Sequence, residues 1–321
     1  MFGDPPRNGV QRLGFLLLPK FSLMAFSSAS EPLRTANVLA GKRLYDWQLI
    51  SMDGKAVTAS NGMQCVPDVS LREVDYLPMV IVCTSFEPEA AESPPLFNWL
   101  RKLGRQGADI GAIDTGSHLL AAAGLLDGYQ ATIHWEHLDS FSELHPRVDV
   151  MQDIYVVDRD RFTSAGSTVG MDMMLNLIRQ QHGYDLAAAV AEEHVYSNIR
   201  EAGQHQRMAL ADRLSTVNAH VLSAVELMRN NLEDPLQTGM IAEELGISQR
   251  ELERLFRKWL HATPGAYYRK LRLERARALL KQTSMPVLEV AVSCGFSSSA
   301  HFSRAYSSCF GHAPSIDRRI R

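Results

Sequence analysis

Short apolar runs alternate with stretches of helical periodicity over the first two hundred residues. Buried strands are predicted at 12–18, 47–52, 79–83 and 109–114. Apolar residues at helical spacing favour helices over 33–39, 96–103 and 117–123. Strands that alternate with helices predict an α/β fold with a parallel sheet covered on both faces. Such sheets bind ligands beyond the carboxyl ends of their strands.

From residue 237 onward, two stretches share one helical plan. In the first, a helix over 240–245 stops at Gly246 and another starts at Ser248; in the second, a helix over 287–294 stops at Gly295 and another starts at Ser298. Ser248 and Glu251 have the spacing of a capping box. The expected buried side chains of the second helices are Leu252, Leu255, Phe256 and Trp259 in the first and Phe302, Ala305, Tyr306 and Cys309 or Phe310 in the second. Helix, glycine-containing turn and helix is the helix-turn-helix pattern.

The opposite faces of these second helices carry polar side chains that suit DNA. Side chains early in a recognition helix contact base edges, and basic residues at the rim bind phosphates. The candidates are Gln249, Arg250, Glu253, Arg254 and Arg257 in the first unit, and Ser299, Ala300, Ser303 and Arg304 in the second. Lys258 and His301 also lie on these outer faces.

A basic helix is predicted between the two units, over 264–281. Its surface carries Arg269, Lys270, Arg272, Arg275 and Arg277. A rigid helix here would fix the distance between two recognition helices, which enter adjacent major grooves about 34 Å apart. The alternative is a helical bundle with a solvated basic face, which two tandem units with matching caps disfavour.

The charge distribution agrees with this division. The 321 residues have a net charge of −3, but residues 1–205 carry 16 Lys/Arg and 25 Asp/Glu, whereas residues 206–321 carry 17 and 11. The halves therefore have net charges of −9 and +6. Such asymmetry indicates that the second half meets a polyanion.

Other bulk features exclude function classes. The longest apolar run, Leu119–Leu126, has eight residues, far fewer than the roughly 20 of a membrane span. Polar and charged residues precede the first apolar run, so a signal peptide is not expected. The four cysteines have neither metal-site spacing nor a dense disulfide pattern. We therefore expect a cytoplasmic protein with no membrane partner, metal or cofactor.

The junction after the strand at 109–114 is the main candidate for chemistry. There a strand enters a helix through a tight turn, which in hydrolases carries the Ser or Cys nucleophile. Asp114 occupies this turn, and the helix start at Thr115 offers backbone N–H groups to a carboxylate. Either Asp114 contacts a ligand or it caps the next helix.

Three further residues are candidates for ligand contact. His134 and His137 have helical spacing, but no third ligand is evident, so a packed or surface cluster is favoured over a metal site. Trp135 would suit a cation over its ring, or it is a core residue. Glu31, which precedes Pro32 at the predicted head of the first helix, is a ligand contact or an exposed acid.

The C-terminal region, about 225–321, closely resembles the AraC-type DNA-binding domain. The residues that carry this resemblance are Ile241-Ala242, Gly246-Ile247-Ser248, Leu252, Arg254-Leu255-Phe256, Pro264, Tyr268, Arg272-Leu273, Ala276, Leu279-Leu280, Gly295-Phe296, His301-Phe302-Ser303-Arg304, Phe310-Gly311 and Pro314. The resemblance implies that Arg250, Glu253, Arg254, Ser299, Ala300, Ser303 and Arg304 approach DNA. Asp317 departs from the pattern, because many members have Tyr there, and it is expected in a frayed end.

Residues about 10–195 resemble the PfpI, or class I amidotransferase-like, domain of GlxA-type AraC regulators. The matching residues are Gly14-Phe15-Leu16, Glu31-Pro32-Leu33-Arg34, Ala36-Asn37, Thr115-Gly116, Leu120-Ala121, Ala123-Gly124-Leu125-Leu126, Thr132, His134-Trp135 and Thr163-Ser164-Ala165-Gly166. The resemblance implies that enzymes of this superfamily carry a catalytic Cys at the position of Asp114, a His at that of Thr115 and a catalytic acid at that of Ser28, so this chain has replaced all three. Without the thiol the nucleophilic chemistry is lost. The subgroup resembles regulators of arginine, betaine or carnitine use.

We therefore expect a flavodoxin-like sensor domain at 10–195, a connection at 196–224 and an all-α DNA-binding domain at 225–321. The expected function is a homodimeric, ligand-responsive transcription activator without a catalytic site, acting on double-stranded DNA and RNA polymerase. Its effector would be an amino acid, betaine or carnitine-like metabolite, held by Glu31, Asp114, Thr115, His134 and Trp135. An active PfpI-type hydrolase and a constitutive architectural DNA binder are the alternatives.

Overall fold

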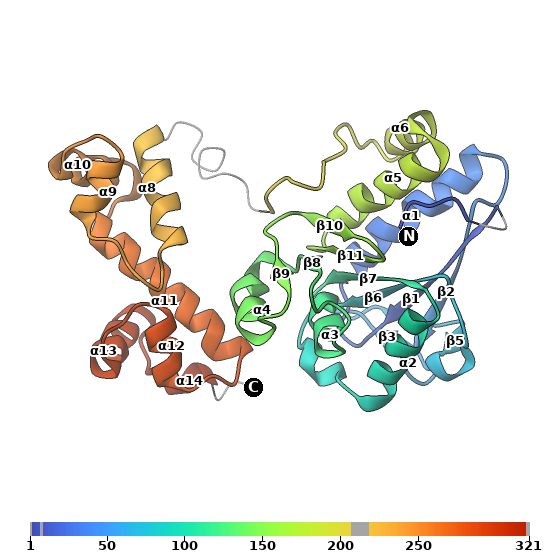
Figure 1. Cartoon of the computed structure of the whole chain (residues 1–321), viewed down its shortest axis with the longest axis horizontal. Helices are drawn as coiled ribbons and strands as arrows, with labels where there is room; N and C mark the ends of the chain where they lie inside the picture. Colours follow the sequence, from blue (N-terminus) through green and yellow to red (C-terminus); the bar gives the residue numbers. More distant parts are fainter. Residues whose placement is uncertain (1, 7–8, 207–217, 319–321) are drawn as a thin grey trace. The chain divides into compact units, whose positions relative to one another are not determined.

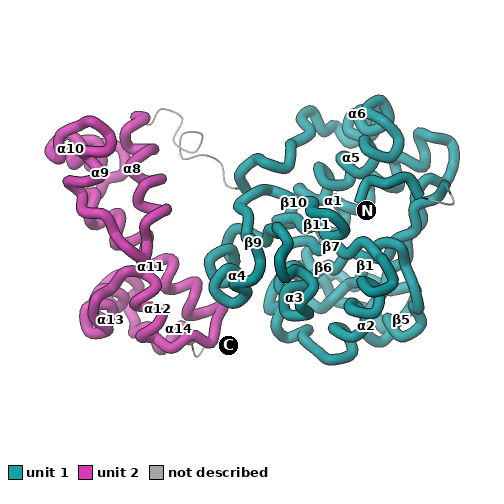
Figure 2. Tube along the Cα trace, viewed as in Figure 1, with its two compact units in different colours: residues 1–206 teal, residues 207–321 magenta. Residues whose placement is uncertain are grey.

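The chain folds into two compact units. The computed structural model describes residues 2–6, 9–206 and 218–318 (Figure 1). Unit 1 comprises residues 1–206 and unit 2 residues 207–321 (Figure 2). None of the helices in the described part of the chain has the length and hydropathy of a membrane span.

Unit 1 is built on a seven-stranded sheet in the order β10-β11-β7-β6-β1-β2-β5. The strands are β1 (Gln11–Leu17), β2 (Tyr45–Ser51), β5 (Val69–Ser70), β6 (Met79–Thr84), β7 (Asp109–Asp114), β10 (Tyr155–Asp158) and β11 (Arg161–Ser164). All neighbours are parallel except β10 and β11. The order β2-β1-β6-β7-β11 is that of a flavodoxin-like sheet, so the predicted fold class is confirmed.

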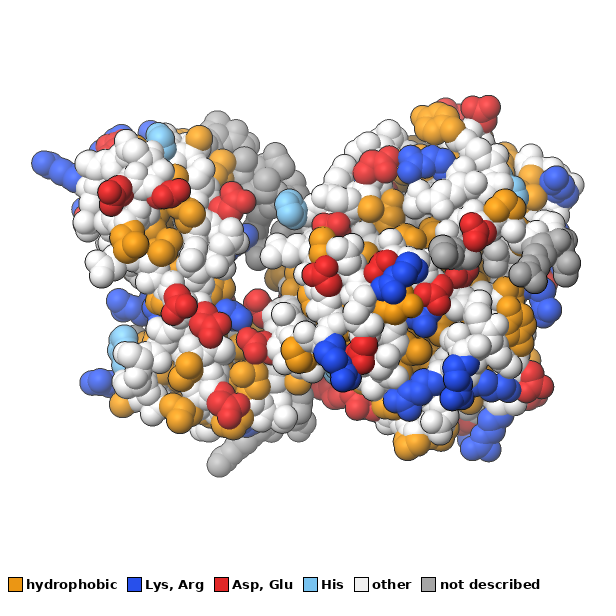
Figure 3. All heavy atoms as spheres, viewed as in Figure 1, with side chains coloured by type: hydrophobic (Ala, Val, Ile, Leu, Met, Phe, Trp, Pro, Cys, Tyr) orange, Lys and Arg blue, Asp and Glu red, His pale blue; other side chains and the backbone are white. Residues whose placement is uncertain are grey.

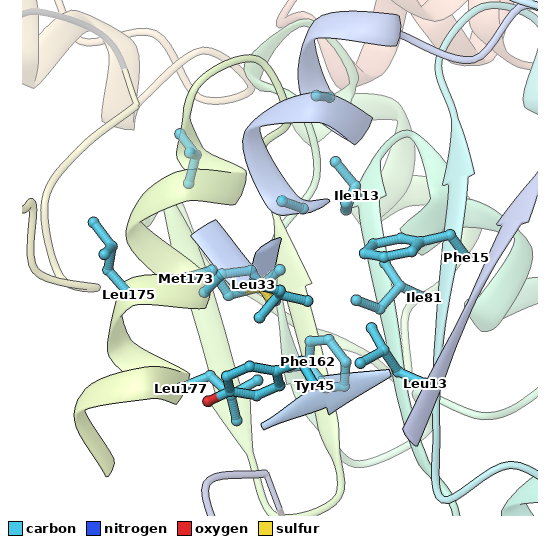
Figure 4. Close-up of a cluster of buried hydrophobic side chains, with 14 of the residues drawn as sticks. Leu13, Phe15, Leu33, Tyr45, Ile81, Ile113, Phe162, Met173, Leu175 and Leu177 are labelled. Atoms are coloured by element: carbon cyan, nitrogen blue, oxygen red, sulfur yellow. The ribbon is translucent and has the colours of Figure 1, made fainter. Parts of the chain in front are cut away.

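Helices cover both faces of this sheet (Figure 1). On one face lie α1 (Leu23–Leu39), α5 (Val169–His182) and α6 (Tyr184–Glu193); on the other lie α2 (Pro94–Arg105) and α3 (Gly116–Ala122). Figure 4 shows the first of these two cores, where Phe15 and Ile81 of the sheet lie near Leu33 of α1. Since neighbouring strand residues point to opposite faces, Phe15 and Leu16 enter different cores.

The remaining elements of unit 1 are short. They are β3 (Val57–Thr58) and β4 (Gln64–Cys65), which pair with each other, β8 (Gln130–Ala131) and β9 (Asp149–Val150), which also pair, α4 (Leu138–Leu144), and the 3-10 turns η1 (Leu71–Glu73), η2 (Pro88–Ala91) and η3 (Trp135–His137).

Helix α1 begins ten residues before its predicted start. Ser22 caps it, its Oγ accepting from the Ala25 N–H at 3.3 Å, and Pro32 lies inside the helix. The prediction placed Pro32 near a helix start, where proline is common. Here the helix tolerates a missing N–H because it packs on the sheet through buried Ala25, Ala29 and Leu33. Glu31 therefore lies in the middle of α1, and its predicted place at the helix head is wrong.

Unit 2 is entirely helical in its described part. Its helices are α8 (Ala219–Asn230), α9 (Thr238–Glu244), α10 (Gln249–Leu260), α11 (Pro264–Gln282), α12 (Val287–Ser293), α13 (Ser299–Phe310) and α14 (Pro314–Arg318). The pairs α9–α10 and α12–α13 are the predicted helix-turn-helix units. Gly246 and Gly295, with φ of +66° and +71°, make the turns after α9 and α12.

Within unit 2, the two helix-turn-helix units have separate cores at the two ends of α11. Tyr268, near its start, packs with Leu252 and Phe256 of α10. Leu273, Ala276, Leu279 and Leu280 of α11 pack with Phe302 and Tyr306 of α13. Nineteen helical residues span about 28 Å. Helix α11 is therefore the structural link between the two helix-turn-helix units, as predicted.

Two local predictions in unit 2, on the capping box and on Asp317, are corrected, and the choice between Cys309 and Phe310 is resolved. The Ser248 Oγ accepts from the Glu251 N–H at 3.1 Å, but the Glu251 carboxylate binds Arg254, so the capping box is half formed. Cys309 is exposed, and Phe310 completes the stripe on α13. Asp317 is 1% exposed and held by neighbouring helices, so this end is not frayed.

The predicted connection, residues 196–224, includes segments that belong to both units. Arg200 forms a 2.7 Å ion pair with buried Asp172, and Ile154 N donates to Gln204 O at 2.8 Å, so these residues pack on unit 1. Residues 219–224 form the start of α8. Residues 207–217 lie outside the described part of the chain.

Candidate functional site

Backbone strain gathers at one edge of the sheet of unit 1. Lys20, Glu87, Asp114 and Ser167 all have φ between +54° and +62°, although none is glycine. They follow β1, β6, β7 and β11, which are neighbours in the sheet, at their carboxyl ends. Such conformations cost about 1–3 kcal/mol each and cluster at functional sites. This edge, where parallel sheets bind ligands, is therefore the candidate site.

Asp114 stands at the centre of this edge. Its side chain is 7% exposed, and its Oδ2 accepts a hydrogen bond from Ser85 Oγ at 3.0 Å. The N-cap position of α3 is taken by Thr115, so Asp114 is not the N-cap of that helix. A Cβ on Gly116 would lie 2.6 Å from the Val82 carbonyl oxygen. Glycine is thus required for the tight approach of α3 to β6 that forms the turn.

The carboxyl of Asp114 is costly to ionise. Burial raises its pKa to about 6, against the opposing influence of His134 and of hydrogen bonds from Ser85 and the Thr115 backbone. An ionised group that is desolvated in this way interacts strongly with a cation.

Thr115 supports this arrangement from below the surface. It is 1% exposed, and its Oγ1 donates to the Ser85 carbonyl at 2.6 Å. Its hydroxyl therefore fixes the segment that carries Ser85, and any contact of Thr115 with a ligand would come from its backbone.

The turn before α5 closes the site on another side. A Cβ on Gly166 would lie 2.7 Å from Asp114 Cβ, so only glycine allows this turn to approach the carboxyl. The next residue, Ser167, accepts through its carbonyl from Ser28 Oγ at 2.8 Å. Ser28 and Asp114, the positions at which the resemblance implies an acid and a nucleophile, therefore flank one turn.

The His134–His137 segment lies close to the same site. His134 interacts electrostatically with Asp114, and its ring centroid is 5.5 Å from that of Trp135. Trp135 is 38% exposed and is therefore not a core residue. Burial, with the neighbouring His134 and His118, lowers the pKa of His137 to about 4. No cluster suited to a metal ion occurs among the described residues.

Glu31 lies apart from these residues on α1. Its carboxylate forms a 2.7 Å ion pair with Arg34, and it lines an open cavity of about 450 Å³ together with Ser28 and His194. The structure thus brings Asp114, Thr115 and His134 together, with Trp135 beside His134. Glu31 is not brought to this group: the cavity that it lines with Ser28 is not lined by Asp114, Thr115, His134 or Trp135.

The predicted DNA-contacting residues lie on α10 and α13. Their N-caps are Ser248 and Ser298, whose hydroxyls accept from the N–H groups of Glu251 and His301. Gln249, Arg250, Arg254, Arg257, Ser299, Ala300 and Arg304 are exposed, whereas Glu253 and Ser303 are half-buried. Lys and Arg side chains project beside both helices at the left of Figure 3.

Two of the basic residues predicted on the surface of α11 have structural partners. Arg272 Nε donates to the Cys294 carbonyl at 2.7 Å, and its guanidinium lies 4.2 Å from the centre of the Phe296 ring. Arg277 pairs with Asp317 at 3.1 Å. Arg272 thus holds the turn after α12, and the prediction that these two arginines form a free basic face is wrong. Arg269 and Lys270 are exposed.

Sequence reasoning missed Ser85 and Ser167, and it included Gly166 in the family resemblance without giving it a role at the site. The polar pair at 84–85 directly follows a predicted buried strand, so Ser85 was within reach of a pattern argument. Gly166 and Ser167 follow β11, a four-residue strand whose periodicity is too short to recognise.

Replacing Asp114 with Asn should stabilise unit 1 near neutral pH. Because folding raises the pKa of this carboxyl from 3.8 to about 6, the folded protein keeps a proton that the unfolded chain releases in this range. The stability that comes from this bound proton is fully present below the unfolded-state pKa of 3.8, and it is lost as the pH rises through the folded-state pKa of about 6. Asp114→Asn should remove this decline and add about 1–3 kcal/mol at pH 7.

This effect is measured by urea unfolding at a series of pH values, with hydrogen exchange of the amides of unit 1 as the probe of unfolding. Asp75→Asn, which removes a carboxylate that is 95% exposed, controls for the loss of one charge. A pH profile identical in the wild type and Asp114→Asn would contradict the prediction.

Comparisons with known proteins agree with this two-part architecture. A model of the DJ-1/PfpI family matches residues 15–180, and a helix-turn-helix domain model matches residues 241–320. The HTH-type transcriptional regulator GbdR of Pseudomonas aeruginosa is 46% identical over 318 residues, which cover 99% of this chain and 87% of that protein. CdhR, an HTH-type transcriptional regulator of the same species, is 46% identical over 310 residues, covering 97% and 92%.

Unit 1 also resembles a solved regulator structure. The AraC family transcriptional regulator from Pseudomonas putida is 31% identical with a TM-score of 0.53, and the match covers 57% of this chain and 99% of that one. Similarity along nearly the whole chain to named regulators makes this protein a DNA-binding transcription regulator. The chain belongs to the family of HTH-type transcriptional regulators that join a DJ-1/PfpI domain to an AraC-type DNA-binding domain.

Proposed function

We propose that unit 1 senses a small zwitterionic or cationic metabolite and has no catalytic activity, and that the protein activates genes for the catabolism of amino acids or quaternary amines. The observation that carries this proposal is Asp114 at the strained turn after β7. This turn has the geometry of a nucleophile elbow but presents a desolvated carboxylate instead of a thiol.

The chemistry of the site favours a cationic group. The Asp114 carboxylate supplies negative charge in a partly dry environment, and the half-exposed ring of Trp135 offers a face to an ammonium or guanidinium. Glu31 extends the negative potential toward the cavity on α1, although Arg34 neutralises part of it. Arginine, glycine betaine and carnitine each carry such a cation together with a carboxylate.

The alternative, an active hydrolase, is disfavoured by the residues at and near the turn. Cys83, on the strand next to Asp114, is buried in the core, where burial raises the pKa of its thiol. Ser28 replaces the acid implied by the family resemblance, and its hydroxyl donates to backbone carbonyls. At that position an Asp nucleophile would therefore meet a hydroxyl instead of the carboxyl that the resemblance implies.

Unit 2 would recognise DNA through α10 and α13, and effector binding would shift a homodimer toward its DNA-competent state. Such a regulator would act in the cytoplasm and would recruit RNA polymerase at its promoters.

Arg254→Ala and Arg304→Ala should each weaken binding to the natural operator. If these exposed arginines contact bases, each loss is about 1–3 kcal/mol. Titration of labelled operator DNA at fixed salt measures the affinity. Arg105→Ala, on the exposed surface of α2 in unit 1, removes the same charge away from the recognition helices and should leave affinity unchanged. Equal affinities for all four proteins would contradict the assignment of the recognition helices.

Asp114→Ala should abolish the response to the effector while leaving operator binding intact. Calorimetric titration of the wild-type protein with arginine, glycine betaine and carnitine should give heat of binding for at least one of them. The same titration with Asp114→Ala should give none, because the cation loses its counter-charge. Absence of heat from all three compounds with the wild type would contradict the proposed ligand class.

Sedimentation of the purified protein should show a dimer in the presence of operator DNA. Two copies would place two pairs of recognition helices on a symmetric site, as in other dimeric helix-turn-helix proteins. A single protein chain per operator at every concentration, with and without effector, would refute the homodimer.

A further inference from the structure

Asp317 is a buried carboxylate to which three neighbouring elements converge. It is 1% exposed and lies on α14. Its Oδ2 accepts from Tyr306 Oη at 2.6 Å and from Arg277 Nε at 3.1 Å. Lys281 Nζ lies 3.5 Å from Oδ1, and His312 Nε2 lies 3.6 Å from Oδ2. Although burial opposes ionisation, the Tyr306 hydroxyl and the cations hold the pKa of Asp317 below its usual range.

These contacts tie α13 to α11. Tyr306 lies on α13, whereas Arg277 and Lys281 are one turn apart on α11. The Tyr306 ring also packs 4.6 Å from that of Phe310, and the Arg277 guanidinium lies 4.7 Å from the Phe310 ring centre. One carboxylate therefore links α13, through Tyr306, to α11, through Arg277 and Lys281.

The first helix-turn-helix unit solves the same problem with different chemistry. Counted from the N-caps Ser248 and Ser298, Phe256 occupies the position of Tyr306, and Tyr267 occupies that of Asp317. Phe256 and Tyr267 meet through their rings, with centroids 5.8 Å apart. The second unit thus replaces an aromatic contact by a hydrogen bond and ion pairs at matching positions.

Rotation of α13 would act directly on the predicted DNA contacts. Arg304 precedes Tyr306 by two residues, which places it about 200° around the helix, on the opposite face. If Tyr306 is released from its partner, the helix can turn, and the Arg304 side chain moves with it.

We propose that Asp317 is a positioning residue for DNA recognition, which holds α13 at the rotation that presents Arg304 to the bases. The inference rests on the proposed role of α13 as a recognition helix. Its basis is the Tyr306 hydrogen bond and the Arg277 and Lys281 ion pairs, which hold Asp317 against the face of α13 opposite Arg304.

Footprinting of the full-length protein on its operator tests this role. Arg254→Ala and Arg304→Ala first define which bases α10 and α13 protect. Tyr306→Phe removes only a hydroxyl, and Asp317→Asn keeps the shape but removes the charge. Both should lose protection over the bases that depend on Arg304, with about tenfold weaker affinity, while the bases that depend on Arg254 stay protected.

The outcomes separate this inference from the proposed function. General destabilisation would lower the folded fraction and reduce protection over all bases equally, and that result would overturn the positioning role. Full protection with Asp317→Asn, in an operator where Arg304→Ala removes protection, would also overturn it. No effect of Arg304→Ala would instead refute α13 as a recognition helix. Circular dichroism at the assay temperature confirms that each variant is folded.

Discussion

The sharp turn from β7 into α3 is the constraint on which the candidate site of unit 1 depends. Two glycines make it possible. Gly116 lets α3 approach the β6 backbone, and Gly166 lets the turn between β11 and α5 approach Asp114. The turn forces Asp114 into a left-handed conformation and buries its carboxyl. Packing of the sheet against helices on both faces supplies the stability that this strained arrangement costs. A catalytic nucleophile and the proposed ligand contact would make the same demand on this turn, because both require one side chain to be held above the sheet edge.

Local signals in the sequence were sufficient for the architecture. Apolar runs at 79–83 and 109–114 became β6 and β7, and the Ser caps and glycine turns of unit 2 marked both helix-turn-helix units. Long-range pairing was not accessible in the same way. Arg272 and Arg277 seemed to be free surface charges because their partners, the Cys294 carbonyl and Asp317, lie 22 and 40 residues away. Glu31 and Asp114 were linked in the prediction only by their charge; they lie on different elements and bind different partners, Arg34 and Ser85.

The tandem units show how one template accommodates different interiors. Their recognition helices share caps and exposed arginines at matching positions, Arg254 and Arg304. Behind them the first relies on ring contacts and the second on a buried acid with basic partners. Some of the basic side chains of unit 2 therefore bind partners within the protein, so the net charge overstates the number of cations that can contact phosphates. This distinction between structural and free cations is invisible to composition.

The single helix α11, with a separate core at each end, also constrains how this domain can evolve. Each residue inserted into such a helix advances its end by about 1.5 Å and turns it by about 100°. A one-residue insertion would therefore swing the second core and its recognition helix to another side of the molecule. Insertions of seven residues nearly restore the direction, but they lengthen the helix by about 10 Å. A change in the length of α11 would thus alter the spacing and direction of the two helix-turn-helix units in discrete steps rather than gradually.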